Sequence, residues 1–393
     1  MARIPYVFNQ LADFLPRDFF DRLVKKHNGN HYIKNYSCWN HLMVMLWAQL
    51  TSRRSLRDIE SSLRAHSDKT YRMGIGAGVS RNNIANANSR RSVSIYRGLA
   101  QEMMRRCSLL SVRDKRLKLI GETFGINGFF AIDSSSVSLD LGRFGWSVPQ
   151  EGYGGIKLHT MYDLVRSVPR MCLVTGHEER DQTFMEHYAY ERGCFYVLDR
   201  LYFKSRGLYA IASSGAYFIT RLKRNVLVET VCEHPADGKH ALSDQTVRLC
   251  GRWAHGGYPD EVRRIRFYCS ERNEVLDFVT NNFEVDPATI ALLYRYRWQI
   301  ELFFKWIKQH LRITSFFGTS ANAVMTQIYV AYTSYCLLAI AADALGFNGT
   351  LYEFSNMISV SLTEKIHLTD LMGRYRRMPL FEPGCDTQLT FDF

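Results

Sequence analysis

The sequence lacks the features that mark several large classes of protein. Its nine cysteines include no Cys-x-x-Cys pair, and their odd number does not suit a disulfide framework, so we expect a reducing, cytoplasmic compartment. With 9 prolines, 26 glycines and 46% hydrophobic residues among 393, collagen-like, low-complexity and disordered chains are excluded. No basic and apolar leader opens the chain, and the most apolar stretch, Ile328–Ala342, is interrupted by Thr333 and Ser334. We expect a buried helix there, too short to span a bilayer.

Positive charge is concentrated near the N-terminus. Residues 1–115 contain 20 basic and 8 acidic side chains, and this surplus equals the net charge of +12 of the whole chain. A basic segment joined to a neutral remainder is typical of a nucleic-acid-binding domain attached to another domain. We expect no membrane binding, because the sequence offers no sustained basic amphipathic helix and no lipidation motif.

Residues 1–115 have mainly helical patterns. Apolar residues recur through Tyr36–Thr51, and a second periodic stretch begins at Ser55. After a glycine-rich piece, Ser80 precedes a short polar helix that begins with Arg81 and Asn82. Arg and Asn can make bidentate contacts to guanine and adenine edges, so this helix either reads DNA bases or is a solvated polar helix.

From about residue 121 the pattern changes to short apolar strands. We expect strands at 128–133, 137–141, 158–162, 170–174, 195–199 and 216–222, and helices at 181–192 and 205–213. The run 137–141 is predicted to be the hairpin partner of 128–133. Residues 225–282 indicate an antiparallel β-rich insertion, followed by a long helix over 287–311 and a second apolar helix over 322–344. These elements predict an α/β fold with a mixed sheet flanked by helices.

Two of the apolar strands end in a carboxylate, Asp133 and Asp199. A buried ionised carboxylate costs several kcal/mol unless a cation or hydrogen bonds compensate it. Each residue alone is more often a strand-end turn or a helix cap than a metal ligand. If the two strands are adjacent and parallel, however, the carboxylates lie side by side, and a bound Mg²⁺ is the simplest remedy for their repulsion.

Five side chains share one stripe of the helix expected over 287–311. At 100° per residue they fall within an arc of about 80°; they are Tyr294, Arg297, Glu301, Lys305 and Lys308. A neighbouring arc is apolar. The stripe is either a functional surface or part of an ordinary amphipathic helix with intrahelical ion pairs, such as Glu301 with Arg297.

These residues resemble the DDE transposases of the bacterial IS4 insertion-sequence group. The pattern Tyr294-x2-Arg297-x3-Glu301-x6-Lys308 matches the group's Y-x2-R-x3-E-x6-K signature without a gap. The runs Ala-Ile-Asp-Ser-Ser at 131–135 and Asp-Arg-Leu-Tyr-Phe at 199–203 resemble its two Asp motifs, in the right order. Leu201 is a departure, because relatives commonly have a small residue there. The resemblance runs from about residue 1 to residue 345.

The resemblance implies a ribonuclease H-like catalytic core with a β-rich insertion, preceded by a mostly helical DNA-binding domain. The expected domains are a basic DNA-binding domain over 1–115, a catalytic domain over 121–345 with its insertion at 225–282, and a C-terminal segment over 346–393 of unassigned role. Asp133, Asp199 and Glu301 would hold two Mg²⁺ ions, with Mn²⁺ as a substitute, for in-line phosphodiester displacement.

Phosphate contacts follow from the same resemblance. Tyr294, Arg297 and Lys308 would grip phosphates beside the cut, and Lys305 shares their stripe outside the signature. Arg81 and Asn82 are the candidate DNA contacts of the N-terminal domain.

The expected function is a DNA transposase of a mobile element. It would bind the terminal inverted repeats of its insertion sequence, cut the ends, and join the 3′-OH ends to target DNA. We expect double-stranded DNA and a second copy of the chain, paired on the element ends, as partners, and no small-molecule cofactor. The expected location is the bacterial cytoplasm, with the nucleoid. Two alternatives stay open: a stand-alone ribonuclease H-like nuclease, and a noncatalytic DNA-binding regulator derived from a transposase, against which the complete set of carboxylates argues.

Overall fold

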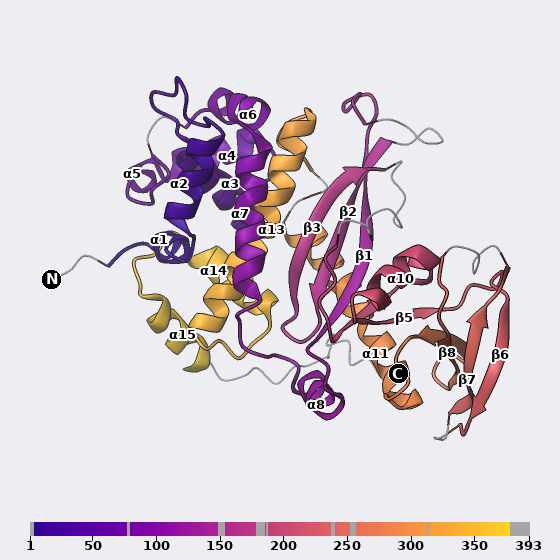
Figure 1. Ribbon diagram of the computed structural model, residues 1–393. Helices are drawn as coiled ribbons and strands as arrows, with labels where there is room; N and C mark the ends of the chain where they lie inside the picture. The colour runs from indigo at the N-terminus through magenta and orange to yellow at the C-terminus, as the bar shows by residue number, and fades with distance from the viewer. Residues whose placement is uncertain are drawn as a thin grey trace. The chain divides into compact units, whose positions relative to one another are not determined.

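The computed structural model divides into two compact units (Figure 1). One unit consists of Met1–Cys107 and Ile307–Phe393, and the other of Ser108–Trp306. The structure describes residues 4–76, 79–147, 154–177, 185, 188–236, 240–251, 257–311, 313 and 315–377. Compact units are a geometric property, so the functional boundaries expected at 115, 121 and 345 remain predictions.

The first unit is helical in its described residues. Its helices are α1 (Val7–Ala12), α2 (Arg17–Lys26), α3 (Cys38–Leu50), α4 (Leu56–Ala65), α5 (Ser67–Thr70), α6 (Arg81–Arg90), α7 (Val93–Cys107), α13 (Ala321–Ala344), α14 (Leu351–Ser361) and α15 (Leu368–Arg377). Serine caps fix three of the expected starts: Ser37 before α3, Ser55 before α4 and Ser80 before α6, each accepting a backbone N–H three residues later. The helical patterns of the N-terminal region are thus confirmed.

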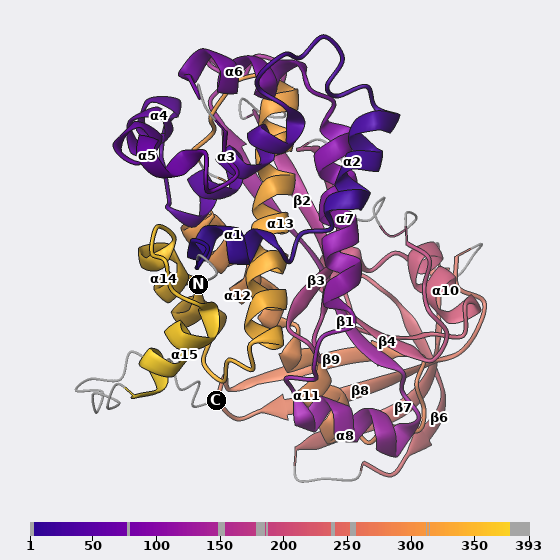
Figure 2. The same ribbon diagram turned by 90° about the vertical axis from the view of Figure 1, so that its left-hand side faces the viewer.

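Helix α13 is the central helix of this unit and packs against α7, α3 and α6 (Figure 2). Its buried polar residue Gln327 forms hydrogen bonds within the fold. The Gln327 amide donates to the Ser315 carbonyl oxygen (2.8 Å) and accepts from the Phe317 N–H (2.8 Å). The prediction that this helix is too short to span a bilayer was wrong. The helix has 24 residues and is long and apolar enough to cross a membrane. Its most apolar window is 89% buried within the structure, and this packing accounts for its apolar composition.

The segment after α14 completes the same unit. The Val7 and Phe8 N–H groups donate to the carbonyl oxygens of Glu364 (3.0 Å) and Leu362 (3.1 Å). The Gln10 side chain donates to the Ile366 carbonyl oxygen (2.7 Å) and accepts from the Leu368 N–H (3.0 Å). The described part of the C-terminal segment therefore has a structural place, beside α1.

The second unit is built on one nine-stranded sheet with the strand order β3-β2-β1-β4-β5-β9-β8-β7-β6. The strands are β1 (Gly128–Leu139), β2 (Gly154–Asp163), β3 (Val168–Gly176), β4 (Cys194–Leu198), β5 (Tyr217–Arg221), β6 (Val228–His234), β7 (Ala241–Leu249), β8 (Val262–Cys269) and β9 (Glu274–Thr280). Strands β1, β4 and β5 are parallel, and the other neighbours are antiparallel. The predicted mixed sheet is confirmed, and the β-rich insertion extends it through β9.

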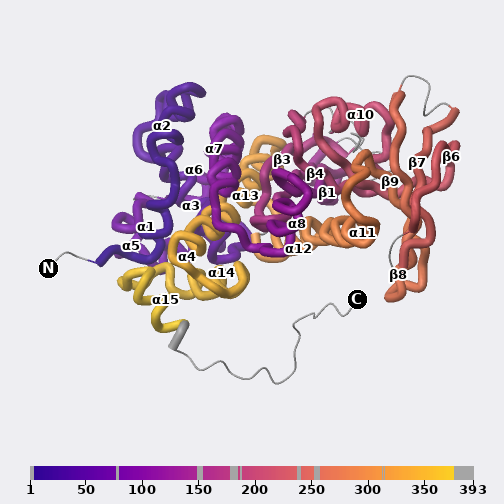
Figure 3. Tube along the Cα trace, turned by 60° about the horizontal axis from the view of Figure 1, so that its bottom comes forward, coloured from indigo at the N-terminus to yellow at the C-terminus, as the bar shows by residue number. Residues whose placement is uncertain are grey.

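Helices of the second unit lie on both faces of this sheet (Figure 3). They are α8 (Lys115–Phe124), the 3₁₀ helix η2 (Arg200–Tyr202), α10 (Ser205–Ser213), α11 (Pro287–Tyr296) and the first part of α12 (Trp298–His310). Phe130 and Ile132 share a buried cluster with Leu208 and Ile211 of α10. Since side chains alternate along a strand, Asp133 points to the opposite face.

Two details differ from the sequence-based expectation, and a third is largely untested. Val137 belongs to β1 and pairs with Ile156 of β2, so no hairpin forms, because the serines after Asp133 continue the strand rather than turn. The helix expected over 287–311 is two helices, joined at Arg297, where the Arg297 N–H donates to the Tyr294 carbonyl oxygen (3.1 Å). The helix expected at 181–192 lies largely outside the described residues.

Candidate active site

The parallel pair β1 and β4 brings two carboxylates together. Ile132 pairs with Leu198, the last residue of β4. The next residues along each strand, Asp133 and Asp199, therefore occupy neighbouring positions. The prediction that adjacent parallel strands align these carboxylates is confirmed.

Arg297 connects Asp133 to Glu301. Its Nη1 donates to Asp133 Oδ2 (3.1 Å) and its Nη2 donates to Glu301 Oε1 (2.8 Å). The other Asp133 oxygen, Oδ1, accepts the Ser134 N–H (2.8 Å). One planar guanidinium thus links a residue of the sheet to a residue of α12, and its side chain is only 13% exposed.

Asp133 lies where an ionised carboxylate is costly. Burial raises the pKa of Asp133 to about 7, and the charges of Asp199 and Glu301 act in the same direction. The Arg297 guanidinium and the Ser134 N–H lower the pKa of Asp133 and offset part of this effect. The site therefore favours further positive charge beside its carboxylates.

Asp199 serves two structural neighbours. Its Oδ1 accepts the Leu201 N–H (2.9 Å) and caps η2, and its carbonyl oxygen accepts from the Thr220 hydroxyl (3.3 Å). The helix cap that the sequence offered as the alternative to a metal ligand is therefore present. Leu201 is 60% exposed, which explains why a side chain larger than the usual small residue fits here.

Lys223 is a cation that the sequence analysis missed. Its Nζ donates to the Phe203 carbonyl oxygen (3.1 Å). Burial lowers the pKa of Lys223, and the charge of Asp199 opposes that shift, so the two side chains interact. A signal was available, because β5 runs parallel to β4 and residues that follow parallel strands gather at one edge of the sheet.

The remaining stripe residues are placed unequally. The Tyr294 ring lies 6.0 Å from the Arg297 guanidinium carbon and 5.0 Å from the Phe278 ring, and burial raises the pKa of Tyr294 to about 12. Lys305 is exposed on α12, one turn after Glu301. Lys308 lies on the same helix but in the first unit. Of the expected phosphate contacts, Tyr294 and Arg297 are the two brought next to the carboxylates.

The first unit carries the other two predicted DNA contacts. Arg81 and Asn82 are exposed at the start of α6, on the short helix that the sequence predicts. Their position on a surface helix agrees with both open interpretations, a base-reading helix and a solvated one.

The donor set fits a hard divalent cation by its chemistry. Asp133, Asp199 and Glu301 offer carboxylate oxygens, which Mg²⁺ prefers. Burial raises the pKa of Asp133, and the charges of Asp199 and Glu301 act in the same direction, so a cation beside these groups would favour the ionised form. Among the described residues no three or more His, Cys, Asp or Glu side chains are grouped closely enough to hold a metal ion. Between Asp133 and Glu301, the positive charge is supplied by the Arg297 guanidinium, which pairs with both carboxylates.

Comparisons with known proteins identify the family of this chain. The family described as "Transposase DDE domain" matches residues 126–337, more than half of the chain and the whole of the carboxylate set. A domain of unknown function, DUF4372, matches residues 5–76. The chain belongs to the DDE transposases.

Individual relatives carry transposase names. The chain is 31% identical over 288 residues to the putative transposase y4zB of Sinorhizobium fredii (strain NBRC 101917 / NGR234). This alignment covers 72% of this chain and 77% of the relative. The chain is 22% identical over 357 residues to the transposase for insertion sequence element IS4SA of Synechocystis sp. (strain ATCC 27184 / PCC 6803 / Kazusa), covering 88% and 95%. The predicted resemblance to insertion-sequence transposases of the IS4 type is confirmed, and membership implies the use of a divalent metal.

A solved structure is similar at a lower level. The piggyBac transposase synaptic complex with hairpin DNA aligns with 98% of this chain and 87% of its own chain, at 9% identity and a TM-score of 0.45.

Proposed function

We propose that this transposase cuts the ends of its insertion sequence by metal-dependent phosphodiester hydrolysis and joins the 3′-OH ends to target DNA. The observation that carries the proposal is the placement of Asp133 beside Asp199 together with the Arg297 bridge from Asp133 to Glu301. The first two are aligned by the β1–β4 register, and Glu301 is tied to Asp133 through Arg297. Three acidic residues from distant parts of the chain are costly to gather unless their charge has a use.

The three carboxylates have the role of metal ligands in this proposal. Asp133, Asp199 and Glu301 would hold two Mg²⁺ ions, or Mn²⁺ in their place. When bound, the metal supplies activation of the attacking water or 3′-OH and stabilisation of the leaving oxygen. The Asp133 side chain is only 16% exposed, and this partial burial would strengthen its interaction with a bound cation.

The basic side chains have the role of holding the DNA. Arg297 offers a planar fork that fits a phosphate bidentately, and Tyr294 offers a hydroxyl beside it. Lys305 and Lys308 follow on α12 as point charges for the flanking backbone. Arg81 and Asn82 in the first unit contact the element ends.

The wider assembly follows from the reaction. Two element ends must be cut together, so we infer a homodimer on paired DNA ends, in the bacterial cytoplasm with the nucleoid and without a membrane. We further infer that β1–β5 form a ribonuclease H-like core. Support comes from the mixed sheet order β3-β2-β1-β4-β5, which aligns the two acidic strand positions.

Excision in cells tests the proposal. A plasmid carries the gene with its native flanking DNA, in wild-type form and as the variants Asp133→Asn and Glu301→Gln. Glu122→Gln is the matched control, because Glu122 is an exposed residue of α8 with a side chain 62% accessible. We expect excised donor junctions with the wild type and the control, and none with the two site variants.

Two outcomes contradict parts of this proposal. Equal excision by all four proteins would overturn the metal-ligand roles. Cut ends that are never joined to target DNA, with purified protein and Mg²⁺, would favour a stand-alone nuclease. Circular dichroism of each purified variant establishes that loss of excision is not loss of folding.

A further inference from the structure

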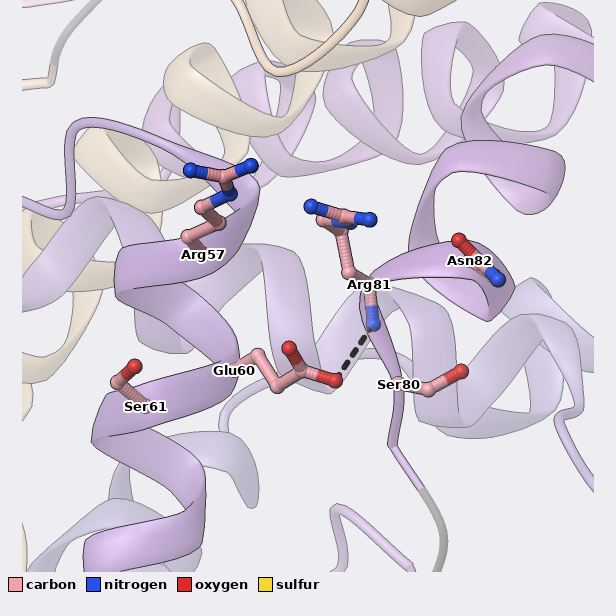
Figure 4. A pocket seen from close by; sticks show the side chains of 6 residues that line it. All are labelled: Arg57, Glu60, Ser61, Ser80, Arg81 and Asn82. Atoms are coloured by element: carbon pink, nitrogen blue, oxygen red, sulfur yellow. Dashed lines mark hydrogen bonds between the residues drawn. The ribbon is translucent and has the colours of Figure 1, made fainter.

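A polar pocket of about 380 Å³ lies between α4 and the start of α6 in the first unit (Figure 4). Six residues line it: Arg57, Glu60, Ser61, Ser80, Arg81 and Asn82. Figure 4 shows the guanidinium groups of Arg57 and Arg81 reaching from the two helices toward the same side of the pocket. The size is within the range of small-ligand sites, and every lining side chain is polar.

The two arginines have charge to offer a ligand. Within the residues that the structure describes, neither the Arg57 nor the Arg81 guanidinium forms an ion pair with a carboxylate. The one carboxylate in the pocket, Glu60, is already engaged, since it accepts the Arg81 N–H (3.1 Å) and lies 4.0 Å from Arg64. With Glu60 balanced by Arg64, the pocket keeps a surplus of two positive charges.

The start of α6 needs no ligand for its own sake. Glu60 satisfies the N–H of Arg81, and Ser80 satisfies the N–H of Asn83 (3.2 Å). The attraction for an anion therefore comes from the two guanidinium groups, which arise from different helices and converge on one space.

We propose that this pocket binds a backbone phosphate of duplex DNA between Arg57 and Arg81, while Asn82 contacts an adjacent base edge. The proposal rests on the proposed function, in which the first unit binds the element ends. A guanidinium pair matches the planar, multi-oxygen geometry of a phosphate. Asn82 is exposed at the next position of α6, and its amide can pair with adenine. The pocket would thus fix the register of the protein on DNA, and Asn82 would supply part of the sequence preference.

Equilibrium binding tests this division of roles. The probes are a labelled duplex from the DNA that flanks the gene and an unrelated duplex of equal length, each titrated with the full chain at several salt concentrations. We expect Arg57→Gln and Arg81→Gln each to weaken binding of both duplexes about tenfold, as loss of a charged hydrogen bond does. The salt slope should fall by about 0.9 for each phosphate contact removed. Asn82→Ala should weaken only the native duplex.

Glu60→Gln provides a test in the opposite direction. The substituted amide would keep an acceptor for the Arg81 N–H but remove a negative charge beside the phosphate. We expect binding of both duplexes to tighten several-fold. Arg105→Gln is the matched control, because Arg105 is an exposed arginine of the same unit, already paired with Glu102 (2.7 Å).

The outcomes separate this proposal from the proposed function. If Arg57→Gln and Arg81→Gln bind as Arg105→Gln does, with an unchanged salt slope, the pocket is no phosphate site, and the transposase function is untouched. An effect of Arg57→Gln on one duplex alone would also overturn the phosphate role. A wild-type chain that binds neither duplex overturns DNA binding by the first unit, and with it this proposal.

Discussion

Removal of Arg297 should destabilise the metal-free protein, because the guanidinium balances two carboxylates at once. The side chains of Arg297, Asp133 and Glu301 are 13%, 16% and 38% exposed. In Arg297→Gln the ion pairs to both carboxylates are lost, and Asp133 keeps a charge that burial disfavours. The pKa of Asp133 is raised only to about 7, so at pH 8 the Asp133 carboxylate is mostly ionised in the wild type.

The size of the effect follows from the burial of each partner. Removal of one member of a buried ion pair costs about 3–5 kcal/mol, whereas an exposed pair contributes about 0–1 kcal/mol. The ion pair of Arg297 with Asp133 is of the buried kind, and its pair with Glu301 lies between the buried and the exposed kinds. We therefore expect Arg297→Gln to lower the free energy of unfolding by about 2–4 kcal/mol at pH 8.

Urea unfolding in EDTA measures this loss. Arg248→Gln is the control, because Arg248 and Glu261 form a surface pair in the same unit, 53% and 40% exposed. Arg297→Lys should give an intermediate value, since Lys keeps the charge but cannot bridge two carboxylates. Added Mn²⁺ should stabilise Arg297→Gln more than the wild type. If Arg297→Gln matches Arg248→Gln in EDTA, the account of the site's electrostatics is wrong.

Two further predictions concern stability away from the site. Arg263 and Asp244 form a buried pair, with Arg263 Nε donating to Asp244 Oδ1 (2.8 Å). Asp244→Ala should therefore lower the free energy of unfolding in urea by about 3–5 kcal/mol. A loss below about 1 kcal/mol, the range of an exposed pair, would contradict this prediction. Burial lowers the pKa of His41 to about 3, and the charge of Arg91 acts in the same direction. Folded protein with neutral His41 then binds fewer protons than the unfolded state. The free energy of unfolding is therefore highest, as far as His41 contributes, above about pH 6.5, and it decreases as the pH falls and His41 of the unfolded state becomes protonated. Between pH 7 and 5 the wild type should lose about 2 kcal/mol more than His41→Gln, and equal losses would refute the prediction.

Local patterns predicted most elements of the fold. Apolar periodicity marked α3 and α4, the Ser80 cap marked the start of α6, and short apolar runs marked the strands around Asp133 and Asp199. Where the pattern was ambiguous the sequence failed. The serines after Asp133 resemble a turn, yet their backbone pairs with β2. Helix α13 is apolar because it is packed on several sides by helices from both ends of the chain, a cause that a local window does not contain.

The candidate site divides in the same way. The alignment of Asp133 with Asp199 could be predicted, because the ends of adjacent parallel strands meet. The pairing of Arg297 with Asp133 could not, since it spans 164 residues and depends on how α12 lies on the sheet. Lys223 escaped notice because it follows β5 with no motif of its own.

The two interpretations of the α11–α12 stripe turn out to be compatible. One interpretation was an ordinary amphipathic helix with intrahelical ion pairs, and Arg297 does pair with Glu301 one turn away. On an exposed helix such a pair adds little to the stability. The same guanidinium reaches Asp133 with its second nitrogen, which ties this helical pair to a carboxylate that is only 16% exposed. A helical ion pair thus becomes a link between sheet and helix, and it holds two of the three carboxylates before any metal or DNA arrives. Arginine suits that position better than lysine because one planar group serves two acceptors.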